Sequence, residues 1–163
     1  MLLLSTALFA QSSETIIREQ PEGTVCEGYG TVKGYTEFYK GLIPYTLDGA
    51  ATRYVLSDED SVYIYNPISG YDSKSWLKGK LDRETGVVTF QLPQQINVEV
   101  ADDGEGQYDD YIIACKMVYS AELETYLVTP DDQELKFQFE DGTLTMLSDQ
   151  FVGIANMEGE WYG

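Results

Sequence analysis

Histidine is absent from all 163 residues of this chain. That absence excludes nucleophile pairs built on a histidine base, and it excludes every zinc or iron site with an imidazole ligand. Only two cysteines are present, which are too few for a structural zinc site. An enzyme with this composition would have to rely on carboxylates, tyrosines or lysines.

Basic residues are also scarce, because ten Lys and Arg face twenty-eight Asp and Glu and leave a net charge of −18. Such a surface repels phosphate backbones and anionic lipids, so nucleic acid is not an expected partner. The charge favours solubility, and cation binding by clustered carboxylates is the alternative. No apolar segment is long enough for a membrane span, and the length suits a single domain.

The first ten residues, MLLLSTALFA, resemble the apolar core of an export signal that ends in small residues. They lack the positively charged leader, and the alternative is a buried N-terminal strand. No cysteine follows, so a lipid anchor is not expected. We expect export to the periplasm, the outer surface or the medium, with residues 1–10 removed. Residues 11–22 then form a flexible lead-in to a single β domain over 23–163.

The segment 62–96 carries the strongest structural pattern. Three runs alternate in character with a period of two, and short turns at 67–70 and 83–86 separate them. This period is typical of strands, whose successive side chains point to opposite faces. Connections this short join antiparallel neighbours, so the segment predicts a meander.

The same criteria predict eleven strands and an all-β fold, an antiparallel meander that closes into a flattened barrel or a β-sandwich. The expected strands are 23–32, 36–45, 51–56, 62–66, 75–81, 87–92, 108–119, 125–129, 135–140, 143–147 and 151–157. Turns at 58–60, 85–86 and 141–142 should join sequential neighbours. A single helical turn near Ala121 is the most helix that we expect.

The clearest local signal is the hairpin KFQFEDGTLTML at 136–147. Asp141 and Gly142 stand between two alternating runs, and both tolerate the positive φ that a two-residue type I′ turn requires. With this simple pairing, the inner face should carry Phe137, Phe139, Leu144 and Met146.

The densest acidic cluster is ADDGEGQYDDY at 101–111. Its carboxylates suit calcium, which takes six to eight oxygen ligands. The candidate ligands are Asp102, Asp103, Glu105, Asp109 and Asp110. The spacing does not fit an EF-hand, and the alternative is a solvated hairpin loop rich in turn-forming residues.

Cys26 and Cys115 are either bridged or free. In an exported chain a disulfide closing so long a loop would stabilise the fold by roughly 4 kcal/mol on the chain-entropy model. The alternative is two buried thiols that act as small hydrophobic residues.

Thirteen tyrosines and two tryptophans suggest carbohydrate binding, because aromatic faces stack on sugar rings. The candidates lie near turns and beside Asp or Asn, and they are Tyr63, Tyr65, Tyr71, Trp76 and Tyr108. The alternative is that these tyrosines are ordinary sheet residues with a packed ring and a solvated hydroxyl.

Several short segments carry a resemblance to a known group. They are PEGT at 21–24, VYIYNPIS at 62–69, SWLKGKLD at 75–82, VTFQLPQQI at 88–96 and FVGIANMEGEWYG at 151–163. On these the chain resembles an uncharacterised group of secreted modular proteins from gut-dwelling anaerobic bacteria. The resemblance implies that residue 163 lies at a module boundary or at a truncation, and it brings no catalytic residue.

These observations predict a non-enzymatic module, secreted or on the cell surface, that acts in adhesion or in binding an extracellular glycan or protein. The absence of a histidine, a nucleophile motif or a phosphate-binding glycine loop carries the prediction, together with the suitability of rigid sheets for recognition loops. One alternative is a carboxylate-based glycoside hydrolase. Another is a lipocalin-like carrier of a small apolar ligand.

Overall fold

The computed structural model describes residues 16–38, 41–147, 150–157 and 159, which hold eleven β-strands and no helix. This confirms the all-β fold class. The strands are β1 (Thr24–Phe38), β2 (Gly41–Leu56), β3 (Ser61–Tyr65), β4 (Trp76–Asp82), β5 (Val87–Gln91), β6 (Gln94–Asp102), β7 (Gln107–Ser120), β8 (Thr125–Val128), β9 (Glu134–Glu140), β10 (Thr143–Met146) and β11 (Val152–Ala155).

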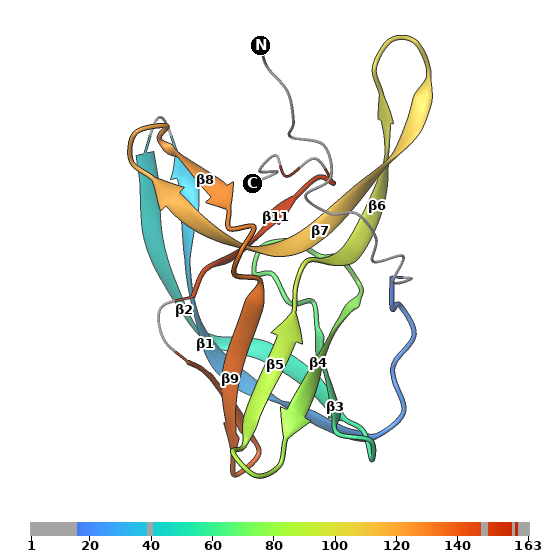
Figure 1. Ribbon diagram of the computed structural model, residues 1–163, viewed down its shortest axis with the longest axis vertical. Helices are drawn as coiled ribbons and strands as arrows, with labels where there is room; N and C mark the ends of the chain where they lie inside the picture. The colour runs from blue at the N-terminus through green and yellow to red at the C-terminus, as the bar shows by residue number, and fades with distance from the viewer. Residues whose placement is uncertain (1–15, 39–40, 148–149, 158, 160–163) are drawn as a thin grey trace.

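Seven strands form one antiparallel sheet in the order β1-β2-β3-β4-β5-β9-β10, which curls into a half-barrel (Figure 1). The curl brings the β9–β10 turn back to β2. There the Tyr54 hydroxyl donates to the Gly142 carbonyl at 2.7 Å, and the Tyr54 ring meets Phe139 edge-on. A side chain of β2 therefore links the two ends of the curled sheet.

The second sheet has the order β11-β7-β6, and β8 pairs with the end of β7. Its central strand, β7, is buried on both faces in the middle, where the sequence reads IIAC at 112–115. Ile112 and Ala114 join the main core cluster with the inner residues of the half-barrel, whereas Ile113 and Cys115 join a second cluster on the opposite face. Burial on both faces explains an unbroken apolar run in place of alternation.

Side chains fill the interior of the half-barrel. Phe90 is fully buried, and its ring meets Phe137 edge-on at 5.7 Å. The ring also lies directly on Gly79, where a Cβ atom would come within 2.8 Å of it. Gly79 is thus required by the close approach of an aromatic ring to the β4 backbone.

Three glutamine side chains complete strand edges. The Gln94 amide accepts from the Lys78 N–H at 2.8 Å and donates to the Lys78 carbonyl at 2.6 Å. Gln133 makes the same two bonds with the backbone of Lys116. Gln150 does so with the backbone of Lys136, at 3.0 Å for each bond. Each amide takes the place of a neighbouring strand that is missing at that point, which satisfies backbone groups that would otherwise be costly to leave unpaired.

The predicted meander holds from β1 to β5 and then breaks. Pro93 has no N–H to donate to a sheet, and after it the chain enters the second sheet as β6, a strand that the sequence prediction missed. The runs expected at 23–32, 36–45 and 51–56 merge into the two long strands β1 and β2. Near Ala121 the chain makes a turn without a helix.

The predicted hairpin at 136–147 is confirmed. Asp141 and Gly142 have φ of 49° and 74°, and Leu144 pairs with Phe139 as the two-residue turn requires. Phe137, Phe139 and Leu144 pack on the main core, and Met146 pairs with Phe137 on the same inner face but is 40% exposed. Met146 ends β10, the last strand of the sheet, and within the described residues no further strand pairs with β10.

The export signal predicted at 1–10 and the lead-in residues 11–15 lie outside the described residues. The rest of the lead-in contacts the body of the domain. The Ile17 carbonyl accepts from the Trp76 N–H at 2.8 Å, so residue 17 pairs with β4 as an isolated bridge. The Arg18 guanidinium donates to the Ser73 carbonyl and to the Asn97 side chain.

Candidate binding site on the β6–β7 hairpin

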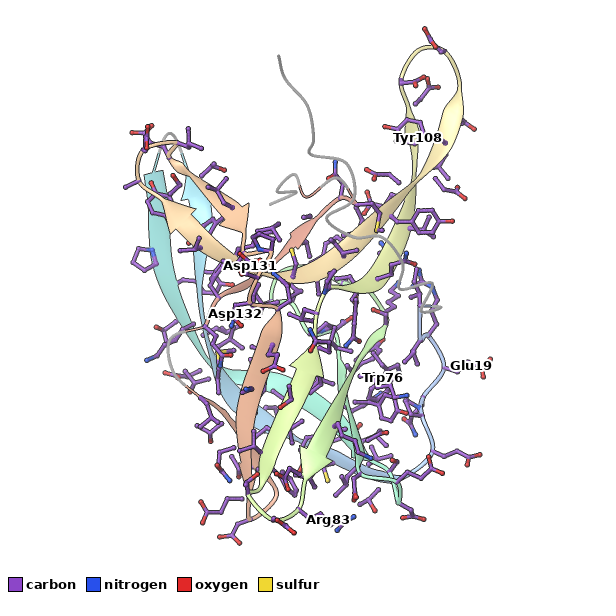
Figure 2. The ribbon with its side chains drawn as sticks, in the orientation of Figure 1. Glu19, Trp76, Arg83, Tyr108, Asp131 and Asp132 are labelled. Carbon is purple, nitrogen blue, oxygen red and sulfur yellow. The ribbon has the colours of Figure 1, made fainter. Side chains whose placement is uncertain are left out.

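The outer half of the β6–β7 hairpin extends beyond the rest of the second sheet and away from the half-barrel (Figure 1). We call it the arm, and it comprises residues 98–102 of β6, the turn 103–106 and residues 107–111 of β7. Four of its large apolar side chains are exposed to solvent: Val98 by 37%, Val100 by 69%, Tyr108 by 50% and Tyr111 by 40%. Figure 2 shows Tyr108 on this arm, far from Trp76 in the body.

The strand register divides the arm into two faces. Glu99 pairs with Asp110 and Ala101 pairs with Tyr108, and cross-strand partners share a face. Together with Asn97 these residues form what we call the polar face. Val98 pairs with Tyr111 and Val100 with Asp109 on the opposite side, which we call the apolar face.

Tyr71, from the β3–β4 loop, makes two hydrogen bonds to the polar face. Its hydroxyl donates to Glu99 Oε1 at 2.8 Å and accepts from Asn97 Nδ2 at 2.8 Å. Arg18 in turn donates to Asn97 Oδ1 at 2.9 Å. The N-terminal segment, the β3–β4 loop and β6 therefore converge at the base of the arm.

The β3–β4 loop is held in shape by Asn66, which has a φ of 46°. Its side chain donates to Asp72 Oδ1 at 2.7 Å and accepts from the Lys74 N–H at 2.8 Å. A loop closed by its own side chain in this way presents Tyr71 in a fixed position.

Glu99 and Asp110 face each other directly across the two strands. Directly opposed residues have Cβ atoms about 4.5–5.5 Å apart, so the two carboxylates are neighbours. Both side chains are partly buried. The polar face thus offers two adjacent carboxylates, an amide and two tyrosines, a set of groups suited to binding hydroxyl-rich molecules.

Of the five aromatic residues that the sequence suggested, only Tyr108 is largely exposed. Trp76 is 3% exposed, and its ring packs against that of Tyr65 at 5.0 Å. The Arg53 guanidinium lies over the Tyr65 ring, 5.6 Å from the ring centroid. Tyr63 lies on β3 with Tyr65 and is partly buried. The Trp76 ring is therefore part of the packed interior and does not lie on the exposed surface.

The acidic loop forms the tip of the arm. Asp102 accepts from the Gly104 N–H at 2.9 Å, and Asp103 accepts from the N–H groups of Glu105 and Gly106. These two carboxylates stabilise the turn, as short acidic side chains commonly do. Within the described residues no group of three or more acidic or cysteine side chains is placed to hold a metal ion. The five residues suggested for calcium are therefore not gathered into a site.

Both cysteines are free thiols, so the disulfide left open by the sequence is absent from the structure. Cys26 lies on β1 opposite Tyr54, whereas Cys115 lies on β7 in the second cluster. Burial raises the pKa of the Cys115 thiol to about 12. Burial is also the main cause of the raised pKa of Tyr54, with a smaller contribution from its contact with Cys26.

A hollow of about 420 Å³ lies where the β5–β6 and β8–β9 loops meet. Asp131 and Asp132 line it, and Figure 2 labels them in the middle of the view, between β8 and β9. Lys116 Nζ donates to Asp132 Oδ2 at 2.7 Å, and this hydrogen bond is the main reason that the pKa of Asp132 is lowered. The hollow is open and polar and holds no aromatic ring.

Sequence patterns did not reveal Arg18, Asn97 or Glu99 as functional candidates. Glu99 stands in the alternating run INVEV, where an outward polar residue is ordinary. Only the pairing of β6 with β7 places it beside Asp110, and only the loop brings Tyr71 to it.

No protein-family model, curated protein or solved structure matches this chain. In the part of the chain that the structure describes, no helix is long and apolar enough to cross a membrane. Function is therefore inferred from the residues of the site.

Proposed function

We propose that the protein is a non-enzymatic binding module of the cell exterior, and that it binds a neutral glycan on the polar face of the arm. One observation supports this proposal above the others. The Tyr71 hydroxyl is held between Glu99 and Asn97 on a face that also presents Asp110 and the exposed ring of Tyr108.

The chemistry of this face suits sugar hydroxyl groups. An ionised carboxylate only accepts hydrogen bonds, and two neighbouring carboxylates accept from several hydroxyls at once. The Tyr108 ring offers a flat apolar surface for the C–H face of a sugar. A neutral glycan is favoured over an acidic one, because Glu99, Asp110 and the net charge of −18 repel anions.

The base of the site is ordered before any ligand arrives. Asn66 fixes the loop that carries Tyr71, and Arg18 holds the amide of Asn97. Side chains already held in one conformation lose little entropy on binding, so a small number of polar contacts suffices for useful affinity.

An array of neutral oligosaccharides, probed with the full chain, tests the proposal. Tyr108→Ala and Glu99→Gln should each weaken binding to any glycan found by at least about tenfold, the usual effect of removing a central polar or aromatic contact. The matched control is Tyr29→Ala, because Tyr29 is 82% exposed on β1 and lies outside the arm. Binding that survives both arm variants, or that Tyr29→Ala removes, would overturn the placement of the site.

The hydrolase alternative rests on the same two carboxylates, Glu99 and Asp110. A glycosidase needs one carboxyl with a raised pKa facing the scissile bond. Release of reducing sugar by the wild-type chain, abolished in Glu99→Gln, would favour the hydrolase. The carrier alternative is less favoured because Phe90 and its neighbours fill the half-barrel.

A further inference from the structure

The free edge of the arm has a feature that the glycan proposal does not use. β6 is the last strand of the second sheet, and within the described residues no strand pairs with the outer side of 98–102. An unpaired strand edge presents a row of N–H and C=O groups to which another chain can add.

The direction of these groups follows from the turn. The Asp103 N–H donates to the Gly106 carbonyl at the end of the hairpin. Because antiparallel strands alternate between bonded and non-bonded pairs, Glu99 and Ala101 point their backbone groups toward β7. Val98, Val100 and Asp102 therefore point theirs toward the free edge.

This edge lacks several usual protections. Residues 98–102 contain no proline and no lysine, and the one irregularity in the β6–β7 pairing falls between Gln95 and Asn97, below the arm. Val98 and Val100 also expose their side chains on the apolar face. A strand added here would gain backbone hydrogen bonds and cover both valines.

Charge determines which strand would fit. Between Ile96 and Ile113 the chain carries six carboxylates and no basic residue: Glu99, Asp102, Asp103, Glu105, Asp109 and Asp110. Two copies of the arm would place these carboxylates side by side, so pairing between copies is opposed by repulsion. A cationic strand would be attracted by the same charges.

We propose that the arm binds an extended, cationic segment of a partner protein, which adds as a strand to the free edge of β6. Alternate apolar side chains of that segment would cover Val98 and Val100. Its basic side chains would then project to the opposite face, beside Glu99 on β6 and near Asp110 on β7. The inference rests on the free backbone edge of β6 and on no glycan contact, so it does not depend on glycan binding.

Two synthetic peptides of equal length test the proposal, one alternating valine with lysine and the other valine with glutamate. Fluorescence anisotropy with the full chain should show binding of the lysine peptide alone, weakening as salt is added. Val100→Pro removes a donor from the free edge but none from the β6–β7 ladder, as proline allows at an edge. It should weaken binding by about tenfold or more, whereas Val100→Thr, which keeps the N–H, should retain most of it.

A second variant covers the case in which Val100→Pro disturbs the fold. The double substitution Glu99→Gln and Asp110→Asn keeps the strand intact, as circular dichroism would verify, and should weaken binding of the lysine peptide. Equal binding of the two peptides, or binding unaffected by both variants, would overturn the proposal. Concentration-dependent dimers that Val100→Pro abolishes would assign the edge to a second copy and would also overturn it.

Discussion

The two ends of the β6–β7 hairpin both carry large apolar side chains but have opposite surroundings. At the base, Ile112 and Ile113 are at most 1% exposed, whereas on the arm Val100 is 69% exposed and Tyr111 40%. The base has β11 beside it and the half-barrel beneath it, and the arm has neither. Segments distant in the sequence therefore cover the apolar residues at the base and leave those on the arm exposed.

The large apolar side chains on the arm are exposed, so the free energy that their burial would provide does not contribute to folding. Fully burying a valine stabilises a protein by about 1.5–3 kcal/mol relative to leaving it in water. At the base this gain contributes to folding. On the arm it remains available to a binding partner, which is the usual meaning of clustered apolar exposure.

Alanine substitutions at the two ends should give the largest contrast. Ile112→Ala opens a cavity in the main core and should lower the free energy of unfolding by about 2–5 kcal/mol. Val100→Ala should change it by less than about 0.5 kcal/mol, because the side chain is already solvated. Urea denaturation measures both. Similar losses for the two variants would mean that the arm is packed in solution.

The glutamine at the start of β6 should give the next largest effect. Gln94→Ala leaves the Lys78 N–H and carbonyl without their partner, which should lower the free energy of unfolding by about 1–3 kcal/mol. The matched control is Gln91→Ala, because Gln91 is exposed. An equal loss in both variants would show that the two Gln94 hydrogen bonds contribute nothing of their own.

Removal of one oxygen atom, that of the Tyr71 hydroxyl, should weaken the contact between the β3–β4 loop and the arm. Tyr71→Phe removes the hydroxyl shared by Glu99 and Asn97 and should destabilise the protein by about 0.5–1.5 kcal/mol. Hydrogen exchange should accelerate at residues 97–99 and stay unchanged at Phe90. Unchanged exchange at 97–99 would show that the β6–β7 pairing alone orders this end of the arm.

The smallest expected effect is a loss of stability at low pH that arises at Asp132. The hydrogen bond from Lys116 holds the pKa of Asp132 below its usual value in the folded state. As the pH falls, the Asp132 carboxyl is therefore protonated in the unfolded chain before it is protonated in the folded one. The stabilisation from the Lys116–Asp132 hydrogen bond is complete above about pH 4 and is lost below it. Because the Asp132 carboxyl is exposed, solvent screens the interaction and the effect on stability is small.

Lys116→Met should raise the pKa of Asp132 toward its usual value, as a carboxyl-carbon titration by NMR would measure. The control is Lys80→Met, since Lys80 Nζ donates to the Glu59 carbonyl and not to a carboxylate. An Asp132 titration that is the same in Lys116→Met and the wild type would contradict the assigned cause.

The sequence predicted the features that depend on neighbours along the chain. The period of two gave the strands, and Asp141-Gly142 gave the hairpin with its two-residue turn. Features that depend on distant residues were not predicted. Nothing in the sequence distinguishes Gln94 from Gln91, although the side chain of the first completes the edge of β4.

The candidate site shows the same limit. Tyr71 and Tyr108 were suggested by their type and their position near turns, but so was Trp76, which is buried. A tryptophan between two alternating runs fits a ligand surface and a packed interior equally well from its neighbours alone. Its pairing with residue 17 and its contact with Tyr65 come from other parts of the chain.

The unbroken course of β7 has a consequence for how accurately the arm is built. This strand begins at Gln107 in the arm, passes between the two core clusters at Ile112 and Ile113, and continues to Ser120. Sliding a strand by one residue would turn every side chain to the opposite face. The buried isoleucines forbid such a slip, so they fix the alignment of the solvated arm from a distance. Glu99 therefore faces Asp110, and Val98 faces Tyr111, without any packing at the tip to hold them in register.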